Sequence, residues 1–259
     1  MNVAANKRVV ESLEGLGRLT LLAKEALVSI LTAKVNWQDL LYQLYFMGAK
    51  SQPVVLITGA FTGMVLGTQT YFQFHSVKMD TATLAVVGVA MCTELGPVLT
   101  GLMVAGRVGA AMAAEIGTMR VTEQIDALRT LATHPVDYLV VPRLIATVLA
   151  MPLLTAEAIA LGIAAGFAVG MGLLGIDGAY AWANMIKYTQ FTELIMGLTK
   201  CFIFGAIIAL VGCYKGMTCS EGAEGVGRAT TEAVVFASIT VLVSNFFLTL
   251  FLTRLLQVS

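Results

Sequence analysis

Five long apolar runs dominate this 259-residue chain. An α-helix needs about 20 predominantly apolar residues to cross a bilayer core of about 30 Å. The runs that meet this requirement cover residues 53–72, 84–108, 144–174, 194–214 and 233–253. Charged residues make up 12% of the sequence, about half the share in an ordinary soluble domain. The sequence therefore predicts an all-α, polytopic integral membrane protein with about five transmembrane helices.

Ionisable residues interrupt three of these runs, with Glu94 and Arg107 in the second, Glu157 in the third and Lys200 in the fourth. Counted from the outer boundary near Leu84 for Glu94 and near Phe191 for Lys200, both residues lie about 14–15 Å deep. Unpaired charge at this depth costs at least about 2.5–3.5 kcal/mol. The sequence thus predicts that Glu94 and Lys200 form a pair or share a polar cavity. For Glu157 we expect a water-filled cavity or a neighbouring hydroxyl such as Thr155.

The distribution of Lys and Arg predicts the orientation, because cytosolic loops carry an excess of both. With a cytosolic N-terminus, only Lys78, Lys187 and Arg254 fall on the far side of the membrane. An odd number of spans then places the C-terminus on that far side.

The region before the first run, residues 1–50, carries an amphipathic pattern. Its apolar stripe comprises Val9, Leu13, Leu16, Thr20 and Leu27. Such a helix lies in the headgroup plane or packs its stripe on the helical bundle, and the pattern favours neither. Residues 51–259 form the predicted transmembrane domain.

A charged segment separates the second and third runs. We expect one short cytosolic helix over about residues 115–131, with Ile125 and Leu128 on one face and Glu123 and Asp126 presenting charge to the side. A soluble partner that pushes on the transmembrane helices would contact such a surface.

Two runs carry glycines at every fourth position: Gly59, Gly63 and Gly67 in the first, and Gly162, Gly166 and Gly170 in the third. Small residues at this spacing let helices approach closely. We expect tight packing within or between subunits, and the pattern leaves open which ladder makes a dimer contact. The third run is also long enough for a break, and Pro152 predicts a kink.

The residues give no sign of catalysis. Two glycine pairs at P-loop spacing lack the phosphate-binding Lys and the magnesium-binding Ser or Thr. His75 and His134 are isolated, the cysteines form no C-x-x-C pair, and the zero net charge does not favour nucleic-acid binding. We expect a protein that is not an enzyme, with no metal or cofactor of its own.

Four motifs point to a family: E-L-G-P-V at 94–98, A-G-R-V-G at 105–109, A-E-I-G-T-M-R-V-T-E-Q-I-D-A-L at 114–128, and G-R-A-T-T at 227–231 before Val234 and Val235. Together they closely resemble the MlaE-type (YrbE) permeases of MCE-associated ABC lipid transporters. One position departs from the pattern, because many relatives carry a basic residue where this chain has Thr93.

The resemblance implies a homodimer in the bacterial inner membrane that binds a separate cytosolic ATPase, which carries ATP and magnesium. It also implies a periplasmic MCE-domain protein as lipid conduit, allows a small STAS-type accessory subunit, and implies phospholipid movement that maintains outer-membrane asymmetry. The residues that it assigns to ATPase coupling are Glu115, Arg120, Glu123, Asp126 and Arg228. We expect Glu94, Glu157 and Lys200 to line the lipid cavity, with Lys200 available to a lipid phosphate and Glu94 holding it.

Two other classes compete with this interpretation. An ion-coupled secondary transporter would use Glu94, Glu157 and Lys200 as a proton or ion relay, although the sequence shows no inverted repeat. A structural scaffold of a membrane complex would not require charges inside the membrane.

Overall fold

The computed structural model describes residues 2–32, 37–76 and 78–257, and their regular structure is helical. Within these residues, five helical segments are long and apolar enough to cross a membrane: Trp37–His75, Thr83–Val121, Val136–Gly172, Phe191–Met217 and Gly222–Leu255. The predicted all-α membrane fold is confirmed. The first span begins at Trp37, inside the region predicted as the N-terminal amphipathic segment.

The first three spans are each built from more than one helical piece. The first comprises α2 (Trp37–Leu44) and α3 (Gln52–His75), and the third is mainly α8 (Val141–Gly172). The second comprises α4 (Thr83–Ala90), α5 (Gly96–Val104) and α6 (Ala110–Val121). Wide π-helical turns over Tyr45–Ala49, Met91–Leu95, Ala105–Gly109 and Val136–Val140 complete these three spans.

Prolines explain three of these turns. Pro53, Pro97 and Pro142 each stand in the first turn of the helix that follows a π-helical turn. Proline lacks a backbone N–H, and its ring clashes with the carbonyl of residue i−4, so the preceding turn widens. Pro152 lies inside α8, which nevertheless continues as one helix to Gly172; the break allowed for in the third run does not occur.

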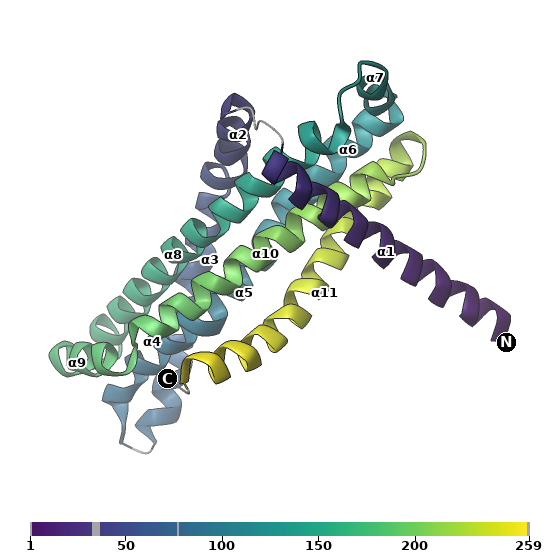
Figure 1. Ribbon diagram of the computed structural model, residues 1–259. Helices are drawn as coiled ribbons and strands as arrows, with labels where there is room; N and C mark the ends of the chain where they lie inside the picture. The colour runs from purple at the N-terminus through teal and green to yellow at the C-terminus, as the bar shows by residue number, and fades with distance from the viewer. Residues whose placement is uncertain (1, 33–36, 77, 258–259) are drawn as a thin grey trace.

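The remaining helices complete the bundle (Figure 1). Spans four and five are α10 (Phe191–Met217) and α11 (Gly222–Gln257), and the short α7 (Gln124–Thr130) follows α6. The helix α9 (Gly178–Tyr188), which sequence analysis missed, lies at the end of the bundle opposite α6 and α7. Its signal was the N-cap Asp177, whose side chain accepts from Ala179 N at 3.0 Å.

The two glycine ladders face each other inside the chain. A methyl group added at Gly59 would lie 2.7 Å from the carbonyl oxygen of Ala158, and one added at Gly63 would overlap Gly162. Spans one and three therefore meet backbone to backbone. Both ladders are used within the subunit, so neither is exposed for a contact between copies.

The N-terminal helix α1 (Asn2–Thr32) crosses the α6 end of the bundle and extends beyond it (Figure 1). It packs through Leu22, Ala26 and Ser29, which are buried. From the predicted apolar stripe, Leu16 and Leu27 remain exposed, and the side chains of Val9 and Leu13 lie outside the described part. Leu16 and Leu27 are thus free to enter the headgroup plane, because a neighbouring face of α1 makes the contact with the bundle.

Candidate functional site

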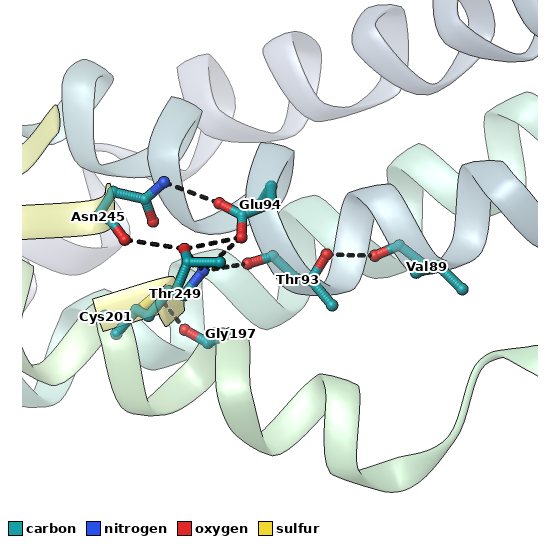
Figure 2. Close-up of polar contacts among 8 residues, drawn as sticks. Val89, Thr93, Glu94, Gly197, Cys201, Asn245 and Thr249 are labelled. Atoms are coloured by element: carbon teal, nitrogen blue, oxygen red, sulfur yellow. Dashed lines mark hydrogen bonds and ion pairs between the residues drawn. The ribbon is translucent and has the colours of Figure 1, made fainter. Parts of the chain in front are cut away.

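Glu94 and Lys200 form an ion pair between the second and fourth spans. Lys200 Nζ lies 2.8 Å from Glu94 Oε1, at the depth where the sequence predicted that the two residues meet. The last span contributes two more polar residues to this ion pair (Figure 2). Asn245 Nδ2 donates to Glu94 Oε2 at 2.7 Å, and Thr249 Oγ1 lies 2.9 Å from Glu94 Oε1. The predicted pairing is therefore present, and it joins three spans rather than two.

Pro97 creates one of the acceptors for Lys200. Because Pro97 has no N–H, the carbonyl of Thr93, four residues earlier, lacks its usual helical partner. Lys200 Nζ donates to this oxygen at 2.9 Å. The E-L-G-P motif thus places a side-chain acceptor, Glu94, beside a freed main-chain acceptor within one wide turn.

The geometry does not fit the expected contact between Lys200 and a lipid phosphate. A lysine ammonium has three N–H donors, and these are used by Thr93 O, Glu94 Oε1 and Thr249 Oγ1. The Lys200 side chain is also 0% exposed, whereas that of Glu94 is 37% exposed. Glu94, not Lys200, is the member of the pair that an external ligand can reach.

Sequence analysis missed Asn245 and Thr249, because a run without formal charge was taken as apolar. The available signal was their spacing of four residues, which places both on one face of α11. In the described part of the chain, Asn245 Oδ1 is buried without a hydrogen-bond partner. The hydrogen-bond network around Glu94 therefore has one unused acceptor, the Asn245 side-chain oxygen.

Glu157 lies in different surroundings. Both of its carboxylate oxygens accept from Gln52 Nε2 at 2.9 Å, at the start of α3. The expected partner Thr155 instead lies 3.1 Å from the thiol of Cys201. Glu157 borders an open cleft of about 400 Å³ between α8 and the first span, lined also by Tyr45. The structure brings Glu94 and Lys200 together but does not bring Glu157 into their hydrogen-bond network.

The segment predicted as one cytosolic helix is divided. The second span continues through Glu115 to the end of α6, and the chain turns at Glu123, whose φ of 59° is left-handed, before α7. The predicted apolar face of α7 is present, since Ile125 is buried and Leu128 packs against the core. The turn sets α7 at an angle that one continuous helix would not allow.

Glu115 is engaged within the chain. Its Oε2 lies 3.0 Å from Nη2 of Arg143, which is buried and also donates to Leu139 O at 2.8 Å. Glu115 thus holds the second span against the start of the third. Its side chain is nevertheless 45% exposed, so the carboxylate pairs with Arg143 and still reaches the surface.

The charges around the α6–α7 turn pair with one another and are about as exposed as Glu115. Asp126 lies 3.2 Å from Arg120 and 2.9 Å from Arg129, and all three side chains are at least 40% exposed. Nearby, Arg228 donates to Ser220 Oγ at 3.1 Å across the start of α11, so it lies in a helix and not in the predicted loop. Arg120, Glu123, Asp126 and Arg228 therefore remain accessible on the end of the bundle formed by α6 and α7.

Comparison with known proteins decides the family. The profile described as "Permease MlaE" matches residues 40–251 of this chain. The chain belongs to the MlaE permease family. A probable ABC transporter permease protein of Rickettsia bellii is 41% identical over 96% of this chain and 97% of its own length. The intermembrane phospholipid transport system permease protein MlaE of Haemophilus influenzae is 34% identical over 95% of both chains.

A third relative is a chloroplast protein. The protein TRIGALACTOSYLDIACYLGLYCEROL 1, chloroplastic, of Arabidopsis thaliana is 36% identical over 89% of this chain and 66% of its own length. The sequence resemblance drawn from the four motifs is thereby confirmed. All four motifs coincide with distinct structural features of the chain: the widened turns at Glu94 and at Ala105–Gly109, the α6–α7 turn and the start of α11.

Proposed function

We propose that this chain is the transmembrane subunit of an ABC transporter that moves phospholipids between the inner membrane and a periplasmic MCE-protein conduit. A separate cytosolic ATPase supplies the energy, and the transport maintains outer-membrane lipid asymmetry. The observation that carries the proposal is a partly exposed carboxylate, Glu94, at the middle of a membrane span. A charge facing lipid at this depth is costly, so this surface is one that faces a cavity or a second subunit.

The fifth span supports a homodimer. Only 11% of its most apolar stretch is buried within the chain, against 50% for each of spans three and four. Because both glycine ladders are occupied inside the subunit, the uncovered face of α11 beside Glu94 is the best surface for a second copy. Two copies that meet there would enclose a cavity with Glu94 and Asn245 on its wall, and a lipid headgroup has matching hydrogen-bonding groups.

The α6–α7 end supports the coupling role. It projects charged, exposed side chains beyond the spans, and α6 is continuous with the second span that carries Glu94. A force on α7 would therefore reach the Glu94 region through one stack of helices. We place this end, with the N-terminus, in the cytosol and the C-terminus in the periplasm. ATP and magnesium belong to the ATPase subunit in this proposal, and a STAS-type subunit is an optional further partner.

The names of the relatives support the same proposal, since the Haemophilus protein is named for phospholipid transport. An ion-coupled carrier receives less support. Its relay would require Glu157 near Glu94 and Lys200, but the hydrogen bonds of Glu157 go to Gln52.

Reconstitution tests the proposal. The purified chain is placed in proteoliposomes with its cognate ATPase, and transfer of labelled phospholipid to an MCE-domain acceptor is measured with and without ATP. We expect ATP-dependent transfer that requires both proteins. Transfer driven by a proton or sodium gradient in the absence of the ATPase would overturn the proposal in favour of an ion-coupled carrier.

A further inference from the structure

A cleft of about 470 Å³ separates α1 from the start of the third span. One wall is the α1 face that carries Leu21, Lys24 and Val28, and the opposite wall is formed by His134 and Asp137. We call this the α1 cleft. It lies apart from the Glu94 group, and none of the roles discussed above uses it.

The position of the α1 cleft matches the headgroup layer of a membrane. The third span starts at Val136, and the first span starts at Trp37, a few residues beyond the end of α1. Leu21 and Val28 on the same wall are exposed apolar side chains. A molecule in the cleft would therefore have apolar contacts on α1 and polar groups at the level where the spans begin.

The polar groups of the α1 cleft are only partly used. His134 Nε2 lies 3.2 Å from Glu25 Oε1, but its Nδ1 is 3.7 Å from Asp137 Oδ1, too far for a hydrogen bond. Lys24 has no hydrogen-bond or ion-pair partner among the described residues. Ser29, which is 6% exposed, is one of the residues that line the cleft, and the described chain leaves its buried hydroxyl oxygen without a partner. Buried polar groups normally have partners, so the unpaired Ser29 hydroxyl indicates a missing ligand.

The charges select the kind of ligand. Glu25 and Asp137 supply two carboxylates, and Lys24 supplies one ammonium. A purely anionic group would meet two like charges, and a purely cationic group would leave Lys24 without a counter-charge. A ligand with an ammonium beside a phosphate satisfies both, because the ammonium donates to the carboxylates and the phosphate accepts from Lys24 and Ser29.

We propose that the α1 cleft binds the headgroup of a glycerophospholipid that carries a primary ammonium beside its phosphate. The phosphate lies against Lys24 and Ser29, and the ammonium lies against Glu25 and Asp137. The acyl chains follow Leu21 and Val28 into the bilayer. Such a lipid holds α1 to the membrane surface at the point where it meets the third span. The site is separate from the transport cavity and does not require that the chain transports lipid.

Photocrosslinking tests the site directly. The full chain is reconstituted in phosphatidylcholine nanodiscs that contain phosphatidylethanolamine with a diazirine near the glycerol end of one acyl chain. We expect crosslinks in the peptides that contain residues 21–29 and 134–137. Unlabelled phosphatidylethanolamine should compete, whereas phosphatidylcholine, which has no ammonium N–H, and phosphatidylglycerol should not. Soluble inorganic phosphate should also fail to compete, which distinguishes a lipid headgroup from a free anion.

Three variants separate the headgroup contacts from the fold. Each lost charge-assisted hydrogen bond should lower crosslinking about tenfold, so we expect this loss in Lys24→Gln and at least this loss in Glu25→Gln with Asp137→Asn. Lys24→Gln removes no contact made by the described chain, so its fold should be intact. The matched control is Glu14→Gln, an exposed carboxylate on the same helix that pairs with Arg18; it should crosslink like the unmodified chain. Equal competition by phosphatidylcholine, crosslinks that map elsewhere, or undiminished crosslinking in Lys24→Gln would each overturn the proposal.

Discussion

Gly63 in α3 packs directly on the backbone of Gly162 in α8, with no space for a side chain between the two helices. The first and third spans therefore depend on the absence of a Cβ at this crossing.

Gly63→Ala should destabilise the chain by about 1–3 kcal/mol, because the added methyl forces the two backbones apart. Thermal unfolding of the purified protein in detergent measures the effect. The matched control is Gly172→Ala at the end of α8, where an added methyl meets no atom within 4 Å. Equal stability of the two variants would show that α3 and α8 can move apart at this crossing at little cost in free energy.

Lys200→Met should be far more harmful than the double change Glu94→Gln with Lys200→Met. The single change leaves a carboxylate unpaired inside the membrane, and removing one partner of a buried pair costs about 3–5 kcal/mol. The double change removes both charges, so the chain should insert and purify normally. We expect it to lose lipid transfer, because the cavity wall loses its carboxylate. Full transfer by the double variant would reduce the pair to a structural role.

Glu115 and Glu123 should behave differently when changed. Glu115→Lys places a second cation beside the buried Arg143 and should destabilise the chain by about 2 kcal/mol. Glu123→Gly keeps the left-handed turn, which glycine adopts easily, and removes the side chain with its carboxylate. We expect Glu123→Gly to fold normally and to co-purify less ATPase. Pull-down of the tagged ATPase with each variant, alongside thermal unfolding, measures both effects; normal ATPase recovery with Glu123→Gly would exclude its carboxylate from docking.

Cys219 should report the orientation of the chain. It lies between the fourth and fifth spans and is half-buried, whereas Cys92, Cys201 and Cys213 are buried. A membrane-impermeant thiol reagent should label it in inside-out vesicles only, and Lys187→Cys on α9 should be labelled only in right-side-out vesicles. The opposite result would reverse the proposed topology.

The pH dependence of this labelling follows from the thiol. Burial raises the pKa of Cys219, and the positive charge of Arg120 offsets part of this rise. Only the thiolate reacts, so a raised pKa lowers the rate at neutral pH. The rate should increase about tenfold for each pH unit until the pH reaches that pKa. A rate that is already constant at neutral pH would mean that the pKa of Cys219 lies below this pH, so that the positive charge of Arg120 outweighs burial.

Much of the fold was predictable, because each membrane span corresponds to one continuous apolar run in the sequence. The pairing of Glu94 with Lys200 was also predictable, because helix rise converts sequence position into depth. The partner of Glu115 was not. Arg143 reads as one more cytosolic cation in the sequence, and only the packing of the third span within the bundle buries it beside Glu115. Likewise, the partner of Glu157 was not predictable, because it is Gln52, an uncharged residue inside the first span.

The wide turn before Pro97 has a consequence for how position 93 can vary. Lys200 contacts the main-chain carbonyl of Thr93, while the Thr93 hydroxyl donates to Val89 O within its own helix (Figure 2). The identity of the side chain is therefore independent of the contact, which any residue at position 93 supplies as long as Pro97 follows four positions later. A basic side chain at this position would thus change the surroundings of the Glu94–Lys200 pair without removing the contact between Lys200 and the main chain.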